Sequence, residues 1–381
     1  MAQTAMPLPA REIAMNSDHY DVVVVGAGLA GLMAAGVTML AGLKVALISN
    51  GPGSFVLSPG WLKACEPDHA GQDGKIRAAV EFFCEMALLA DCKFQGDLGG
   101  TRALPTVLGE FQEVVLAPES LWNAEPRNES MTAVVGIRGL TDFDENFIAE
   151  RMSDNARAMG FHCNYAARRV SLEHDLGIPA TTAHIASYFD RSAAFCSQLA
   201  AALRSVAVGH DRILIPGMLG IRSSGRQLAQ FQRELGTSFS ELATLPPSIP
   251  ALRVFHCLER LLQKRGVELR RGYPVEQLNI EHGQCVSLRV EAPGHAAILQ
   301  GDCVVLAAGH QSAQICGPEF AGIDRAMRPL SQQGAVLAEN VLVPQAETGG
   351  EFASEANFTK IVSGYRAGRL AATAKGCYAA S

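Results

Sequence analysis

The sequence GAGLAG at residues 26–31 is a G-x-G-x-x-G motif, and it lies between a run of four valines and a helix-forming stretch. In such a motif Gly26 permits a tight turn, Gly28 lets the backbone approach a phosphate, and Gly31 lets the helix pack closely on the strand. The start of the helix offers free N–H groups and the positive end of its dipole to the anion. The motif predicts a nucleotide phosphate site rather than a ligand-free turn, with contacts at Gly26, Gly28, Leu29, Ala30 and Gly31.

A second strand, KVALIS at 44–49, ends in Ser49 followed by Asn50. Dinucleotide sites usually carry Asp or Glu at this point, where the carboxylate accepts hydrogen bonds from the adenosine ribose. Ser49 and Asn50 can hydrogen-bond a ribose, but without charge. FMN has no adenosine, so this strand end favours FMN as the cofactor and keeps FAD as the alternative.

Three further segments are candidates for cofactor contacts. The run GDCVVLAAGH at 301–310 is a buried strand ending in Ala-Ala-Gly, as in flavoproteins whose last strand passes close to the cofactor, and it brings in Gly309. Ser58 lies in the loop that follows the second strand, where it serves either a cofactor contact or a surface turn. Gly349 and Gly350 supply a further possible backbone contact.

The acid–base group of the predicted site is not identified by any motif. The candidates are His310, which directly follows Gly309, His256 on a predicted helix, and Arg253, which has the charge to bind an anion. A histidine on such a helix is more often packed than catalytic, so a structural role is favoured for His256. The chain has no nucleophile elbow, no HExxH motif and no P-loop.

The elements that must position these residues are those of an α/β fold. Residues 20–50 are expected to form strand, turn, helix and strand, with the helix over 29–41. The buried strand at 303–308 should join the sheet built on 21–26. We expect a Rossmann-type FAD/NAD(P)-binding domain with an inserted α+β cap. The predicted boundaries are an N-terminal extension (1–19), a discontinuous flavin-binding domain (20–96 and 248–381) and a substrate-side insert (97–247).

Outside the first unit of secondary structure the pattern is less regular. Further helices are predicted at 74–92, 144–160 and 250–266, and a strand at 134–140. Three strand-like runs close the regular part of the chain, at 267–281, 283–292 and 297–310. The region 97–247 otherwise reads as irregular, and the proline pair at 246–247 marks its end.

Composition narrows the function classes. The net charge of −6 argues against nucleic acid as the main partner, because phosphate binding needs a basic face. The ten cysteines are scattered without any C-x-x-C pair, which fits neither a zinc nor an iron–sulfur site, so we expect no metal. Reduced, scattered cysteines indicate a cytoplasmic protein. Residues 22–43 are uncharged, but their glycine pattern argues against a membrane span, and the first nineteen residues lack the apolar segment of a secretory signal.

With these motifs identified, the chain resembles the B subunits of anaerobic glycerol-3-phosphate dehydrogenases. The resemblance runs over most of the chain. It rests on DVVVVGAGLAGLMAA (21–35), SFVLSPGWL (54–62), ALPTVLGEFQEVVLAP (103–118), VVGIRGLTDF (134–143) and LPPSIPALR (245–253). The family is expected to end in a strand, a glycine-rich turn and a helix close to the flavin. Residues 341–372 follow this order of elements but carry no clear motif.

The resemblance implies a flavoprotein subunit of anaerobic respiration. Such a subunit carries FMN and relays electrons from glycerol 3-phosphate, oxidised on a larger FAD subunit, toward an iron–sulfur subunit and quinone. Contact with the inner face of the cell membrane would then occur through partner subunits. Two alternatives remain open. One is a standalone FAD-dependent oxidase or dehydrogenase of a small amine or hydroxy acid, and the other is a non-catalytic scaffold subunit that has lost its flavin.

Overall fold

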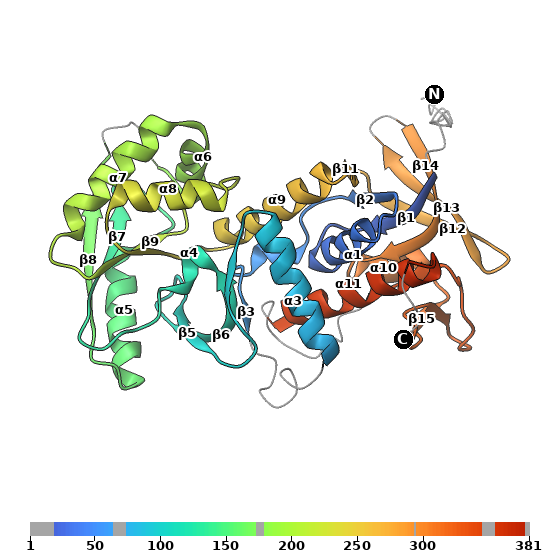
Figure 1. The fold of residues 1–381 in the computed structure, drawn as a ribbon, viewed down its shortest axis with the longest axis horizontal. Coiled ribbons are helices and arrows are strands. Elements are labelled where there is room, and N and C mark those ends of the chain that lie inside the picture. The colour runs from blue at the N-terminus through green and yellow to red at the C-terminus, as the bar shows by residue number, and fades with distance from the viewer. Residues whose placement is uncertain (1–18, 64–73, 173–178, 293–294, 345–354, 378–381) are drawn as a thin grey trace, which may run out of the picture. The chain divides into compact units, whose positions relative to one another are not determined.

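The computed structural model describes residues 19–63, 74–172, 179–292, 295–344 and 355–377. The chain divides into two compact units, each built from separate stretches of sequence. Unit 1 comprises Met1–Gly53, Leu262–Thr348 and Lys360–Ser381, and unit 2 comprises Ser54–Leu261 and Gly349–Thr359. The elements are labelled in Figure 1.

Unit 1 is built on a seven-stranded sheet, with the order β11-β2-β1-β14-β13-β12 and with β17 paired to β14. Five strands are parallel: β1 (His19–Val25), β2 (Val45–Ser49), β11 (Glu268–Arg271), β14 (His295–Leu306) and β17 (Val341–Leu342). β12 (Val275–Glu281) and β13 (Gln284–Ala292) extend the sheet as an antiparallel hairpin.

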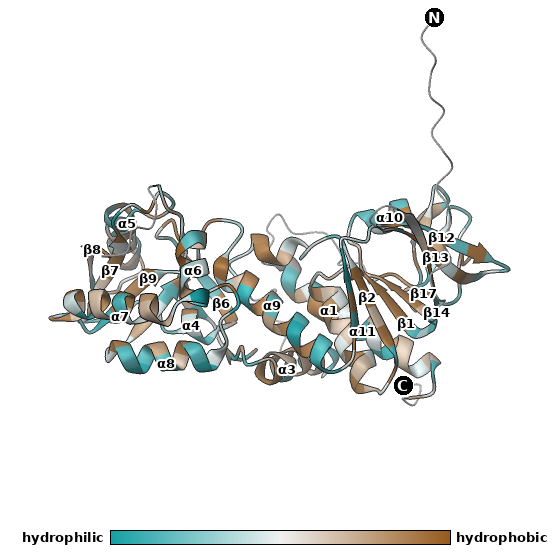
Figure 2. Ribbon diagram, turned by 90° about the horizontal axis from the view of Figure 1, so that it is seen from above, coloured by the Kyte–Doolittle hydropathy of each residue, from teal (hydrophilic) through white to brown (hydrophobic). Residues whose placement is uncertain are grey.

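The pairing of β1 with β14 decides the fold class. Val22 lies opposite Cys303 and Val25 opposite Leu306 in a parallel register. The strand expected at 303–308 therefore joins the sheet built on 21–26, as predicted, although it ends at Leu306. Figure 2 shows these central strands as hydrophobic, which a strand covered on both faces requires. The mixed α/β fold with a Rossmann-type unit is confirmed.

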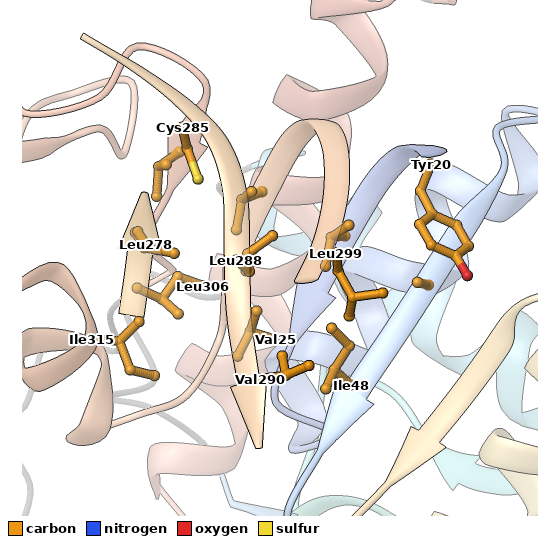
Figure 3. Close-up of a cluster of buried hydrophobic side chains, with 14 of the residues drawn as sticks. Tyr20, Val25, Ile48, Leu278, Cys285, Leu288, Val290, Leu299, Leu306 and Ile315 are labelled. Carbon is orange, nitrogen blue, oxygen red and sulfur yellow. The ribbon is translucent and has the colours of Figure 1, made fainter. Parts of the chain in front are cut away.

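Apolar side chains pack on this sheet from strands far apart in the sequence. Tyr20, Val25 and Ile48 contribute from the N-terminal strands, and Leu288 and Leu306 from the C-terminal ones (Figure 3). All five are buried, at 5% exposure or less. Burial of this kind contributes most of the stabilisation of a sheet.

Two helices pack together beside the sheet. α1 (Leu29–Leu40) is buried over most of its length. α11 (Glu355–Ala374) follows β17 and lies against α1. A Cβ on Gly364 would stand 2.2 Å from the carbonyl oxygen of Ala30, and one on Gly368 would stand 3.0 Å from the Cα of Ala34. The two helices approach this closely only because both positions are glycine. The remaining elements of unit 1 are α10 (Gln311–Cys316), β15 (Phe320–Ile323) and β16 (Pro329–Ser331).

Unit 2 contains a second parallel sheet, in the order β10-β9-β7-β8. Its strands are β7 (Met131–Ile137), β8 (Asn164–Val170), β9 (Arg212–Pro216) and β10 (Phe239–Leu242). Its helices are α5 (Glu145–Ala158), α6 (Thr182–Arg191), α7 (Ala193–Ala207) and α8 (Gly225–Leu235). α8 alternates hydrophilic and hydrophobic residues (Figure 2) and buries Phe231 and Leu235.

A smaller antiparallel sheet completes unit 2. β6 (Phe111–Pro118) lies at its centre and pairs with β3 (Leu62–Lys63), β4 (Phe94–Gly96) and β5 (Arg102–Pro105). The other elements are the 3-10 turn η1 (Ser54–Leu57), α3 (Gly74–Leu89), α4 (Glu119–Trp122) and α9 (Ile249–Lys264).

The unit boundaries differ from those expected at 96/97 and 247/248, and they fall at 53/54 and 261/262. β3 and β4 pair with β6, so residues 54–96 belong with the middle of the chain. The middle region is also more regular than its sequence suggests, since it holds a complete parallel sheet. The run 267–281 is two strands rather than one, because Gly272 takes a left-handed φ of +76° and Pro274 follows it.

Candidate functional site

The glycine loop begins where β1 ends. The Gly26 N–H donates to the Ile48 carbonyl at 2.7 Å, which ties the turn to β2. Gly26 has a φ of +101°, and a Cβ there would lie 2.3 Å from the carbonyl oxygen of Ala307. Conformation and space both require glycine at this position. The same contact brings the end of β14 against the loop.

Gly31 and Gly28 have different roles in the loop. A Cβ on Gly31 would lie 1.7 Å from the Gly26 carbonyl oxygen, so only glycine lets α1 pack on the turn. Gly28 has an ordinary φ of −67°, and a Cβ there would meet no atom within 4 Å. Space is therefore open beside the Gly28 backbone. Gly53, with a φ of +68°, packs against the Cα of Gly28 from another side.

The start of α1 adjoins this open space. Gly28 caps the helix without any side-chain hydrogen bond, and the first turn holds no acidic residue. The first intrahelical bond runs from Leu32 N–H to the Gly28 carbonyl at 2.9 Å. The N–H groups of Leu29, Ala30 and Gly31 precede that bond and are the donors that a helix start presents to an anion. Donors without a side-chain cap, a first turn without an acidic residue and open space beside Gly28 fit a phosphate group.

The end of β2 lies at the same edge of the sheet, because Ile48 pairs with Val25 in register. The Ser49 carbonyl accepts hydrogen bonds from the N–H groups of Gly272, at 2.8 Å, and Tyr273, at 3.4 Å. Ser49 is 6% exposed, while Asn50 is exposed. These are the positions expected to face a ribose, and neither carries charge.

Gly309 and His310 follow β14 at that edge. Gly309 has a φ of +62°, and its Cβ position meets no atom within 4 Å. His310 is exposed at the start of the short helix α10. The alanines before them reach the loop, since Ala307 and Ala308 both lie against Gly26. The structure thus brings the segment after β14 to the glycine loop.

Ser58 belongs to unit 2, whereas the glycine loop belongs to unit 1. Its side chain is buried, so it is not in a surface turn. The hydroxyl donates to the Phe55 carbonyl at 2.6 Å and accepts from the Asn357 amide at 2.9 Å. The first contact closes the loop of Ser58, and the second ties that loop to α11. Gly349 and Gly350 lie outside the described residues.

Arg253 is engaged in an ion pair inside unit 2. Its guanidinium donates to the Glu241 carboxylate at 2.6 and 2.9 Å and to the Gly220 carbonyl at 2.8 Å. Both side chains are buried, at 5% exposure or less. The Arg253 charge, expected to serve an external anion, is thus neutralised internally. Arg253 also lines a cavity of about 290 Å³.

His256 lies one turn further along α9. Its Nδ1 is 3.4 Å from Glu259 Oε2, and its ring meets the Phe255 ring edge-on at a centroid distance of 5.2 Å. This arrangement is that of a packed histidine. His256 and Arg253 belong to unit 2, whereas His310 belongs to unit 1.

Three glycines that shape the site were not expected from the sequence. Gly53 packs on Gly28, and Gly364 and Gly368 pack on α1. The four-residue spacing of the last two in GYRAG was a readable signal of close helix packing. The final strand and helix that the C-terminal outline suggested are present as β17 and α11.

A metal centre and a membrane span would each need a recognisable arrangement of residues. Within the described ranges, no group of three or more His, Cys, Asp or Glu side chains is arranged to hold a metal ion. Among the helices of those same ranges, none combines the length and the apolar character that crossing a bilayer requires.

Comparison with known proteins gives sequence matches of two kinds. The family model for the FAD binding domain matches residues 21–81, which include the glycine loop and β2. The B subunit of anaerobic glycerol-3-phosphate dehydrogenase from Glaesserella parasuis is 22% identical over 84% of this chain and 80% of its own length. The corresponding protein from Pectobacterium carotovorum is 25% identical over 86% and 84%. The resemblance expected from the sequence is confirmed.

Solved structures that match this fold in part belong to longer chains. An L-amino acid deaminase from Proteus vulgaris matches with a TM-score of 0.32 and 16% identity, over 80% of this chain and 57% of its own. A 3-ketosteroid delta1-dehydrogenase from Sterolibacterium denitrificans matches with a TM-score of 0.32 and 16% identity, over 77% and 48%. This chain therefore spans about half the length of these two proteins.

Proposed function

We propose that this chain is a flavin-dependent oxidoreductase subunit that holds the phosphate of its cofactor on the glycine loop of unit 1. The observation that carries the proposal is Gly28, whose backbone borders open space at the uncapped start of α1. The match of the FAD binding domain over 21–81 supports a flavin as the occupant. When bound, a flavin accepts electrons from a substrate and passes them on.

The residues of this chain then bind and orient the cofactor. Gly28 allows close approach, and the N–H groups of Leu29, Ala30 and Gly31 donate to phosphate oxygens. Ser49 and Asn50 lie where an adenosine ribose would bind and offer only uncharged hydrogen bonds. We propose FMN as the flavin for that reason, with FAD as the alternative. Of the three acid–base candidates, His310 is the one that lies in unit 1. We propose no catalytic step for it.

The names of the relatives suggest the place of this chain in a complex. The B subunit of an anaerobic glycerol-3-phosphate dehydrogenase is by name one part of a larger enzyme. We propose that this chain likewise works with an FAD-containing catalytic subunit and an iron–sulfur subunit. It would relay electrons from glycerol 3-phosphate toward quinone, on the cytoplasmic side of the membrane, with membrane contact made by a partner.

The test begins with the purified full chain. We expect a yellow protein with a flavin absorbance that bleaches on reduction, and the mass of the released cofactor distinguishes FMN from FAD. Gly28→Val should lose the flavin while keeping the fold, because its side chain enters the proposed phosphate space and its Cβ meets no protein atom within 4 Å. The matched control is Gly322→Val in β15, where a Cβ also meets nothing within 4 Å and flavin should be retained.

Other outcomes separate the alternatives. A colourless chain that takes up neither FMN nor FAD would identify a scaffold subunit and overturn the proposal. Steady turnover of an amine or a hydroxy acid by the isolated chain would identify a standalone enzyme. A Gly28→Val variant that unfolds like the native protein and still binds flavin would remove the glycine loop as the phosphate site.

A further inference from the structure

Two cysteine thiols of unit 2 lie close together, although they are far apart in the sequence. Cys92 follows α3, and Cys257 lies in the middle of α9. The side chains of Cys92 and Cys257 lie within interaction distance of each other, and both are free thiols. The Cys257 thiol also donates to the Ser223 carbonyl at 3.8 Å. The Cys92 backbone is anchored, since its N–H donates to the Ala87 carbonyl at 2.9 Å and the preceding Asp91 carbonyl accepts from Gly225 at 2.6 Å.

The two cysteines have neighbours of opposite charge: an arginine contacts Cys257, and an aspartate adjoins Cys92. Arg260 donates from Nη2 to Cys257 Sγ at 3.1 Å, and Arg253 lies one turn earlier on the same helix with its charge shared by Glu241. On the other side, Asp91 adjoins Cys92. The hydrogen bond from Cys92 and the Arg260 charge lower the pKa of Cys257 in spite of its burial. The same hydrogen bond, together with burial, raises the pKa of Cys92. Cys257 is therefore the thiol of the pair that loses its proton more readily, and the thiolate then accepts from Arg260 and Cys92.

The pair can be reached by a small molecule. Cys92 is partly exposed and lines the cavity of about 290 Å³, together with Ser120, Gly225 and Arg253. Cys257 is 1% exposed and lies one helical turn after Arg253, which lines the same cavity. A cavity of this size admits a molecule such as hydrogen peroxide.

We propose that Cys92 and Cys257 form a redox-modifiable site, which a peroxide oxidises to an intramolecular disulfide. The Cys257 thiolate attacks one peroxide oxygen and breaks the O–O bond, giving a sulfenic acid and hydroxide, which is protonated to water. The Cys92 thiol then attacks the sulfenic sulfur, forms the S–S bond and releases the oxygen as a second water. Two thiols and one hydrogen peroxide thus give one disulfide and two waters.

The other thiols provide a contrast within the same chain. Burial raises the pKa of Cys84 and of Cys196 to about 11, and that of Cys303 to about 12. Cys84 also lies in unit 2 and is partly exposed like Cys92. The thiolate is the reactive form, so these cysteines should remain reduced under mild peroxide.

The test treats the full native chain with hydrogen peroxide, blocks the remaining thiols by alkylation and maps the peptides without reduction. Trypsin releases VFHCLER (254–260), and additional cleavage after Glu85 separates Cys84 from Cys92. We expect a cross-linked peptide that joins Cys92 to Cys257. Absence of this peptide, or a cross-link from Cys84 at comparable yield, would overturn the proposal.

Variants test the role of each group. Cys92→Ser should leave Cys257 as a sulfenic acid that dimedone traps, whereas Cys84→Ser should cross-link like the native chain. Arg260→Met should slow disulfide formation at neutral pH by roughly tenfold and move its pH profile upward, because the thiolate loses a charge-assisted hydrogen bond. Arg260→Lys should restore much of the rate. An unchanged pH profile in a folded Arg260→Met variant would show that Arg260 has only a packing role.

Discussion

Replacing Glu241 with alanine should destabilise unit 2 more than a typical core truncation. Glu241 is fully buried on β10, where its carboxylate accepts from the Arg253 guanidinium and from the N–H groups of Met218 and Leu219. Removal of the carboxylate leaves the Arg253 charge buried without its counter-ion. Loss of one partner from a buried ion pair costs about 3–5 kcal/mol. We expect a loss of that size in the free energy of unfolding.

Two further variants separate charge from packing. Glu241→Gln keeps an amide oxygen for Met218 and Leu219 but loses the charge, so its cost should lie below that of alanine. The double variant Glu241→Met with Arg253→Met removes both charges and should recover most of the stability, since apolar replacement of a whole pair is often nearly neutral. Urea unfolding, followed by tryptophan fluorescence and by circular dichroism, measures all three. A cost below about 1 kcal/mol for Glu241→Ala would refute the reasoning.

The same pair predicts how stability depends on pH. Burial alone would raise the pKa of Glu241, but the Arg253 charge and its hydrogen bonds outweigh burial and hold the pKa below its ordinary value of 4.5. A carboxyl with a depressed pKa in the folded state contributes stability that is fully present above its unfolded pKa and is lost as pH falls through the folded pKa. Native protein should lose this contribution below about pH 4.5, and Glu241→Gln should show a shallower acid limb.

Three other substitutions test the site. Gly31→Ala should lower the melting temperature sharply, because its methyl group would overlap the Gly26 carbonyl, whereas Gly322→Ala should leave the melting temperature unchanged in a thermal scan. Gly364→Leu should cost roughly 2 kcal/mol or more in urea unfolding, since it drives α11 away from Ala30. Asn50→Glu should improve FAD affinity roughly tenfold or more by adding a charge-assisted hydrogen bond to the ribose, with FMN affinity nearly unchanged. Fluorescence titration of the apoprotein measures both affinities, and equal gains for the two flavins, or a gain with Asn50→Gln, would contradict the ribose contact.

The parts of the fold that the sequence predicts are those with local signals. The valine run, the glycine spacing and the polar end of β2 lie within thirty residues of one another, and each constrains the next. The strand at 303–308 is identifiable because a parallel strand buried on both faces reads as a continuous apolar run. Gly26, Gly28 and Gly31 occupy the places in the loop that their spacing indicates.

The parts that the sequence does not predict depend on non-local pairing. Residues 54–96 follow the first βαβ unit directly, yet β3 and β4 pair with β6, and this moves the unit boundary. The charge of Arg253 suggests anion binding until Glu241 is placed beside it. Cys92 and Cys257 show no local motif, because residues 165 positions apart in the sequence come together only in the folded chain. Local sequence patterns do not reveal contacts between residues that are far apart in the sequence.

The glycines around α1 differ in what requires them, and the difference bears on function. At Gly26, Gly31, Gly53 and Gly364, the place of a Cβ is taken by backbone atoms of another segment, which cannot move aside as a side chain can. Folding alone explains glycine at these four positions. Gly28 has an ordinary φ and free space beside it, so no contact within the described chain excludes a side chain there. The proposed flavin, with its phosphate at the start of α1, would fill this space and so would account for glycine where the protein itself does not demand it.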